Sequence, residues 1–175
     1  AITRMEDVDQ REASFQEFGQ LFAKADSPQL ARYGKKIAKK PGLEMPALVG
    51  QPLALEGVTA MGAALDWESY RGQVVLVDFW ATWCGPCRAA MPQVKALYEE
   101  HRDQGFEVVG ISLDKDPAAM AKYVQENDIP WTNLVGDQAK QLATKYGIRG
   151  IPTMILVDRE GNVAAINHSL DNLKP

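Results

Sequence analysis

The sequence predicts an α/β sandwich whose sheet contains a parallel pair of strands. Residues 73–80 form a run of branched apolar residues, which is typical of a strand buried on both faces. A helical pattern over 85–102 follows, and a second strand pattern over 106–113 comes directly after it. A strand, helix and strand in this order place the two strands parallel in one sheet and pack the helix on one face.

The remaining elements extend this unit toward the C-terminus. Asp158–Asn162 separates the last two strands and predicts a hairpin turn, in which Gly161 tolerates a positive φ. A further hairpin is expected before the main sheet, from residues 50–57 and 64–70. The other predicted elements are helices over 117–127 and 138–146, with residues 131–135 between them, and strands over 153–158 and 162–167.

Two helical patterns precede the α/β domain. Phe15, Phe18 and Phe22 recur at helical spacing, and a second pattern over 28–38 ends at Pro41-Gly42. We therefore expect a helical extension over 1–45 and a domain over 46–175, whose final helix would begin only near Leu170. Four lysines near the end of the extension indicate a solvated helix end or, alternatively, a surface for an acidic partner or a membrane: Lys35, Lys36, Lys39 and Lys40.

Composition excludes several classes of function. The net charge of −4 gives no electrostatic footprint for nucleic acid. No apolar run approaches the roughly 20 residues needed to cross a bilayer, so membrane contact is expected only through a leader or anchor preceding Ala1. The only two cysteines share one motif, which suits an oxidising compartment.

The two cysteines are the most informative residues of the chain. Cys84 and Cys87 follow the first strand directly, and Pro86 suits the first turn of a helix. Their i, i+3 spacing turns both sulfurs to one side of that helix, close enough for a disulfide. The helix N-terminus stabilises a thiolate on Cys84. Cys84 is therefore predicted to attack a substrate disulfide, and the deeper, less exposed Cys87 to resolve the mixed disulfide.

A cysteine pair with this spacing has two other uses in proteins, a zinc site and a structural disulfide. A structural zinc site needs about four ligands, whereas His101 and His168 lie far apart and are interpreted as surface or packing residues. A purely structural disulfide over so short a loop would restrict the unfolded chain little. Redox chemistry is the stronger hypothesis. The uncharged Gly85-Pro86 dipeptide favours the reducing end of the potential scale.

Asp78 is a carboxylate inside an otherwise apolar strand. Burial should raise its pKa, which would let it accept the proton of Cys87 during resolution. The alternative is an aspartate at a strand end that reaches solvent. Trp83 could offer a flat contact to substrate or simply pack, and Arg88 could add positive charge near the thiols or face solvent.

These residues resemble the thioredoxin superfamily. Trp83-Cys84-Gly85-Pro86-Cys87 matches its active-site motif, Asp78 its buried aspartate, and Pro92 its helix-kinking proline, while Gly150-Ile151-Pro152-Thr153 looks like its cis-proline loop. The resemblance covers roughly residues 50–170. It implies a thioredoxin-like three-layer α/β/α sandwich with a central mixed sheet. It also implies substrate contacts from Trp83, Gly85, Pro86, Ile151 and Pro152.

Within that superfamily the sequence is most similar to the exported oxidoreductases of the TlpA/ResA kind, which are related to the AhpC/TSA proteins. Phe79–Cys84 and Gly105–Ser112 are typical of this branch, as is the long stretch before Pro152. The branch often has Glu-Pro between its cysteines, whereas this chain has Gly-Pro. The resemblance implies reduction of protein disulfides, an upstream dithiol donor and no cofactor beyond the disulfide. It also implies a periplasmic or cell-envelope location, with the cytoplasm as the alternative.

Two further functions remain as alternatives. A thiol peroxidase of the peroxiredoxin kind requires proline and threonine upstream of its cysteine, where this chain has Val77 and Ala81. A docking or scaffold protein would use the extension over 1–45, and docking could coexist with catalysis.

Overall fold

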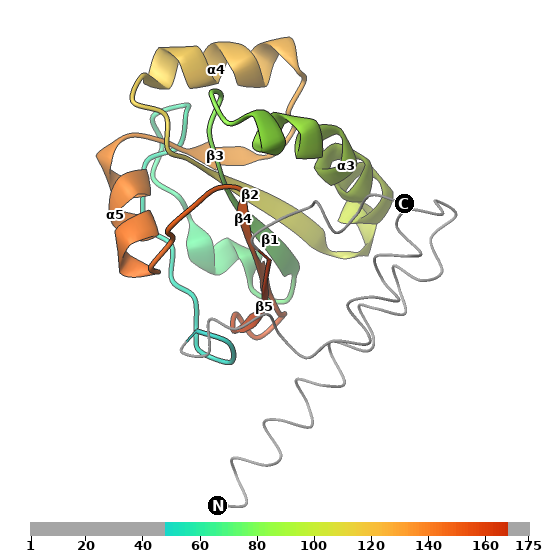
Figure 1. Cartoon of the computed structure of the whole chain (residues 1–175). Coiled ribbons are helices and arrows are strands. Elements are labelled where there is room, and N and C mark those ends of the chain that lie inside the picture. Colours follow the sequence, from blue (N-terminus) through green and yellow to red (C-terminus); the bar gives the residue numbers. More distant parts are fainter. Residues whose placement is uncertain (1–47, 168–175) are drawn as a thin grey trace, which may run out of the picture.

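The computed structural model describes residues 48–167, which form a mixed five-stranded sheet flanked by helices (Figure 1). The strand order is β3-β2-β1-β4-β5. β1 pairs in parallel with β2, and β2 with β3, whereas β4 lies antiparallel to both β1 and β5. The strands are β1 (Val74–Trp80), β2 (Phe106–Ser112), β3 (Thr132–Leu134), β4 (Thr153–Val157) and β5 (Val163–Asn167).

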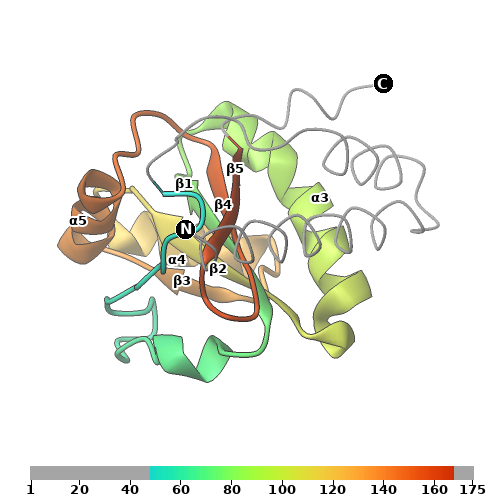
Figure 2. The same cartoon turned by 90° about the horizontal axis from the view of Figure 1, so that it is seen from below.

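Helices cover both faces of this sheet. One apolar cluster joins residues of α3 and α4 to the first face, and a second joins α5 and the short helix η1 to the opposite face. Figures 1 and 2 show α3 and α5 on opposite sides of the sheet. The predicted three-layer α/β/α sandwich is therefore confirmed. The helices are α3 (Gly85–His101), α4 (Pro117–Glu126), α5 (Asp137–Lys145), η1 (Trp67–Tyr70) and η2 (Arg102–Gln104).

β1 is the central strand, and all seven of its residues are buried. Alternate side chains enter the two clusters: Leu76 and Trp80 face α3, while Val77 and Phe79 face α5. This explains why the sequence shows a continuous apolar run instead of an alternating one. Because β1 is hydrogen-bonded to a strand on each side, its carboxyl end fixes the position of the residues that follow.

The predicted elements from residue 73 onward are confirmed, with ends that differ by one residue at most. Pro117 follows Asp116, whose side chain accepts a hydrogen bond from the Ala118 N–H and caps α4. The turn between β4 and β5 forms as expected, with Gly161 at φ 85°. One strand, β3, was not predicted, because a three-residue run lacks the length that identifies a strand.

The predicted hairpin of residues 50–57 and 64–70 forms only next to its turn, where the Leu65 N–H donates to the Gly57 carbonyl and Val58 forms an antiparallel bridge with Ala64. Residues 50–53 pair instead with the end of the turn between β4 and β5, through Pro52 and Asn162 and through the Gly50 N–H and the Val163 carbonyl. The segment after Leu65 turns into η1, because Asp66 caps it by accepting from the Ser69 N–H. Apolar residues in both segments are buried against the α5 face, so burial, more than strand pairing, explains their apolar pattern.

Gly110 on β2 lets a side chain of the neighbouring strand β3 lie close to the backbone of the sheet. The Asn133 side chain lies directly over it, and a Cβ at this position would fall 2.0 Å from Asn133 Oδ1. That oxygen accepts a 3.0 Å hydrogen bond from the buried Trp80 indole. The absence of a side chain at Gly110 thus makes room for a polar contact that ties β3 to β1.

The extension over 1–45, the helix expected near Leu170 and His168 lie outside the described residues and stay predictions. The same holds for the boundary at residue 46. Among residues 48–167, no helix is long and apolar enough to cross a membrane.

Candidate active site

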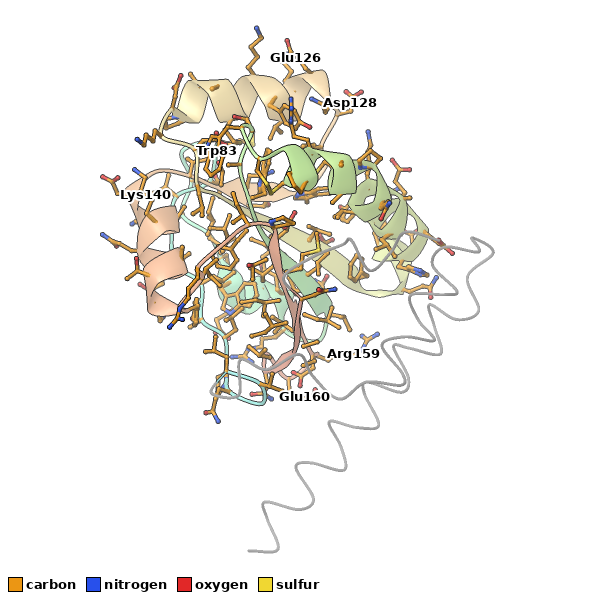
Figure 3. The ribbon with its side chains drawn as sticks, in the orientation of Figure 1. Trp83, Glu126, Asp128, Lys140, Arg159 and Glu160 are labelled. Atoms are coloured by element: carbon orange, nitrogen blue, oxygen red, sulfur yellow. A yellow bond between two sulfur atoms is a disulfide. The ribbon has the colours of Figure 1, made fainter. Side chains whose placement is uncertain are left out.

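The two cysteines lie where β1 passes into α3. A tight turn joins these elements, closed by a 3.1 Å hydrogen bond from the Cys84 N–H to the Ala81 carbonyl. Helix α3 then begins at Gly85, with Cys84 as its N-cap and Pro86 in its first turn. Figure 3 shows Trp83 at this end of the molecule, with Arg159 and Glu160 at the opposite end.

Cys84 and Cys87 form a disulfide, with their α-carbons 5.2 Å apart. The Cys87 N–H donates a 3.2 Å hydrogen bond to Cys84 Sγ, so the sulfur takes the place of an N-cap oxygen. The same N–H and the positive end of the helix dipole would stabilise a thiolate at Cys84 after reduction. Cys87 lies within the helix, so its own sulfur does not cap the N-terminus.

Exposure distinguishes the two cysteines much less than the sequence suggests. The exposed fraction is 5% for Cys84 and 2% for Cys87. The accessible groups are their neighbours: Trp83 is 65% exposed, and Gly85 and Pro86 also face solvent. The electrostatics of the helix end, and not exposure, therefore set the difference between the two sulfurs.

The loop before β4 lies beside Cys84. The Ile151–Pro152 peptide bond is cis, and the Ile151 carbonyl oxygen is 3.7 Å from Cys84 Sγ. This proximity follows from the topology, because β4 pairs directly with β1 and its first residue, Thr153, is paired with Phe79. Pro152 is buried and Ile151 half-buried, so the loop forms one wall beside the disulfide.

Asp78 lies on the face of β1 that packs against α3. It shares this face with Leu76 and Trp80, which belong to the same apolar cluster as Cys87. Its cross-strand neighbours are Gly110 and Met154, neither of which carries a polar side-chain donor. Asp78 is 2% exposed, and its Oδ1 has no hydrogen-bond partner among the described residues. Desolvation raises the pKa of Asp78 to about 7.

The structure also reveals three polar residues that the sequence analysis did not single out. Asp114 is buried just beyond β2 and accepts hydrogen bonds from Thr82 and Ser112. Thr82 belongs to the turn that precedes Cys84. A signal existed in the sequence, since Ser112 ends a buried strand and Asp114 follows it, at the same edge of the sheet as the cysteines.

Three further residues named from the sequence belong to the same helix. Arg88 is exposed on α3. His101 is buried at the far end of the same helix, which agrees with a packing role. Pro92 lies within α3, where the helix continues through it.

Comparison with known proteins places this site in a family. The sequence profile described as Redoxin matches residues 40–172. The chain belongs to the redoxin family. Its fold is that of the thioredoxin superfamily, as the solved structures below show.

This redoxin is 28% identical over 102 residues to the thiol-disulfide oxidoreductase ResA of Bacillus thuringiensis, and the aligned region covers 58% of each chain. It is 32% identical over 97 residues to ResA of Geobacillus thermodenitrificans, with 55% of each chain covered. The matched region thus spans little more than half the length of these relatives.

Among solved structures, this redoxin is similar to the thioredoxin domain of a thiol-disulfide oxidoreductase from Bacteroides vulgatus. The TM-score is 0.65 and the identity 30%, covering 71% of this chain and 91% of that one. A thiol:disulfide interchange protein from a Bacteroides species gives a TM-score of 0.64 and 31% identity, covering 72% and 84%.

The raised pKa of Asp78 predicts how the stability of this redoxin depends on pH. The folded protein keeps the proton of Asp78 up to about pH 7, whereas the unfolded chain releases it near 3.8. Stability due to this group is therefore lost as pH rises between these values. In Asp78→Asn that loss is absent, so the variant should gain up to ~4 kcal/mol over the parent above pH 7.

Urea unfolding of the two oxidised proteins across this pH range measures the gain. Asp116→Asn, which removes an exposed carboxylate, is the control for a general loss of charge. A constant difference between Asp78→Asn and the parent at every pH would contradict the buried, protonated state.

Proposed function

We propose that this protein is a thiol–disulfide oxidoreductase that reduces disulfides in protein substrates. The observation that carries the proposal is the Cys84–Cys87 disulfide at the N-terminus of α3, with Cys84 Sγ accepting from the Cys87 N–H. This geometry stabilises one thiolate selectively, which is what directional thiol–disulfide exchange requires. The names of the ResA relatives and of the Bacteroides structures support the same activity.

The reaction begins from the reduced dithiol. The Cys84 thiolate attacks one sulfur of a substrate disulfide, forming a mixed disulfide and releasing the other substrate sulfur as a thiolate. Cys87 then gives up its proton and attacks Cys84 Sγ. This step closes the Cys84–Cys87 disulfide and releases the second substrate thiolate. Two electrons pass to the substrate, and an external dithiol donor must return them.

Asp78 is the proposed acceptor for the Cys87 proton. It lies on the face of β1 that packs against α3, and its pKa of about 7 lets it take and return a proton near neutral pH. The unpartnered Oδ1 leaves room for a new hydrogen bond from a thiol or a water.

Substrate would bind across the exposed surface around the disulfide. Trp83 offers a large, solvent-facing aromatic ring, with Gly85 and Pro86 beside it. The Ile151–Pro152 loop forms the other side of Cys84. An extended substrate segment could pair with the Ile151 backbone, as in other strand-addition complexes.

The partners and location follow from the ResA likeness and are part of the proposal. We infer protein disulfide substrates, an upstream dithiol donor, no nucleic acid, and a periplasmic or cell-envelope location. The net charge of −4 supports the exclusion of nucleic acid. No cofactor beyond the Cys84–Cys87 disulfide is proposed. Fractionation of cells expressing the full-length gene tests the location, and recovery with cytoplasmic proteins would contradict it.

Trapping of the intermediate tests the function directly. Reduced Cys87→Ser should form a lasting mixed disulfide with a disulfide-containing protein such as insulin, because the second attack is missing. Cys84→Ser should form none, since its remaining thiol lies inside the helix. Mass spectrometry identifies the linked cysteine. Trapping through Cys87, or hydrogen peroxide consumption by the parent without insulin reduction, would overturn the proposal.

The reducing direction is tested by the potential of the cysteine pair. Because Gly85-Pro86 carries no charge, the potential should lie nearer the thioredoxin end than the DsbA end of a scale of roughly −270 to −120 mV. Equilibration with glutathione buffers measures it. A value at the DsbA end would show that this protein is an oxidant.

The role of Asp78 is tested by separating the two steps of the reaction. Asp78→Asn keeps the size of the side chain but cannot accept a proton, so release from the mixed disulfide should slow about 10-fold or more near neutral pH. The first attack by Cys84 should change little, because the helix N-terminus remains. Stopped-flow measurement resolves both steps. Release at the parental rate would make Asp78 a structural residue only.

A further inference from the structure

We propose that Asp114 is a positioning residue that holds the turn before Cys84, and thereby keeps the Cys84 sulfur at the N-terminus of α3 when the disulfide is reduced. Only the importance of this positioning for catalysis rests on the proposed thiol–disulfide exchange. The position of the thiolate can be measured without any substrate.

The Asp114 side chain is surrounded by donors. Its Oδ2 accepts from the Thr82 backbone N–H at 2.9 Å and from the Ser112 hydroxyl at 2.8 Å. Its Oδ1 accepts from the Thr82 hydroxyl at 2.6 Å. The Asp114 N–H in turn donates to Ser112 Oγ at 3.2 Å. Asp114 is 5% exposed, so these bonds are shielded from competing water.

Thr82 is the residue through which Asp114 acts. It occupies the second position of the turn from Ala81 to Cys84, and the carboxylate holds both its backbone N–H and its hydroxyl. The base of the turn is fixed by a further bond, from the Leu113 N–H to the Trp80 carbonyl at 2.9 Å. The chain leaving β1 is thus tied to the chain leaving β2 before it reaches Cys84.

This anchoring becomes important when the disulfide opens. In the oxidised form the bond to Cys87 restrains Cys84. In the dithiol form that restraint is lost, while the bonds from Thr82 to Asp114 are not part of the reaction and can persist. They keep Cys84 Sγ near the Cys87 N–H, where the helix N-terminus stabilises the thiolate. The same turn presents Trp83 to solvent.

Positioning and charge predict opposite changes in the pKa of Cys84. Loss of positioning moves the thiolate away from its N–H donor and raises this pKa. Loss of a nearby negative charge, by itself, lowers it. The direction of the change therefore identifies how Asp114 acts.

The experiment measures the pH dependence of Cys84 alkylation by iodoacetamide in the reduced full chain, followed by peptide mass spectrometry. Thr82→Val removes one bond and leaves the charge of Asp114 in place, so labelling at about pH 6 should slow about threefold. Thr82→Ser retains the hydroxyl and should label at the parental rate. Asp114→Asn should raise the pKa of Cys84, because an amide has only one acceptor oxygen in place of the two that accept from the N–H and the hydroxyl of Thr82.

Asp116→Asn is the matched control. It removes a carboxylate two residues away that is exposed and caps α4, so the pKa of Cys84 should not move. Thermal unfolding is measured on every variant. A parental pKa in Thr82→Val, with or without lower thermal stability, would make the cluster merely structural. A lower pKa in Asp114→Asn would show that Asp114 acts by charge alone. Either result overturns the proposal, whereas failure of the trapping experiment would affect only the function.

Discussion

The hydrogen bond from the Cys87 N–H to Cys84 Sγ is the interaction on which the chemistry of this protein depends. It exists because a helix starts immediately after a buried strand, with Cys84 as the N-cap and a proline in the first turn. β1 fixes where that helix starts, since the strand is paired on both sides and buried on both faces. The sheet therefore acts as the rigid support that holds the Cys84 sulfur in place, which matters because small displacements would break this hydrogen bond.

Two buried carboxylates, one within β1 and one just beyond β2, have opposite surroundings. Asp78 lies between Gly110 and Met154, has an oxygen without a partner, and has a pKa raised to about 7. Asp114 has donors at both oxygens. A carboxylate that lacks partners is costly to ionise and suits proton transfer. One that is fully hydrogen-bonded suits anchoring. Both residues are aspartates, so their different environments, and not their chemistry, suit them to different roles.

The sequence predicted the parts of the structure that local patterns determine. The strand and helix around Cys84 follow from an apolar run, a proline and a cysteine spacing, and Asp78 stood out as a charge within that run. The hairpin predicted within residues 50–70 forms only next to its turn, because the other apolar residues of this segment are buried against the α5 face, where no regular period applies. β3 was missed because three residues give no period. The Asp114 cluster depends on contacts across 32 positions of sequence, which no local pattern records.

These long-range contacts also explain why the motif alone does not define the site. The five residues from Trp83 to Cys87 determine a helix start, but they do not determine where the turn before it lies. Asp114 binds Thr82 of this turn from just beyond β2, and the Ile151 carbonyl approaches Cys84 from the loop before β4. Both lie next to the ends of strands that pair directly with β1. A cysteine pair transferred to another helix would keep the dipole but lose both neighbours. The motif therefore supplies the reacting sulfurs and the helix N-terminus, while the ends of β2, β1 and β4 together determine where that N-terminus lies and what surrounds Cys84.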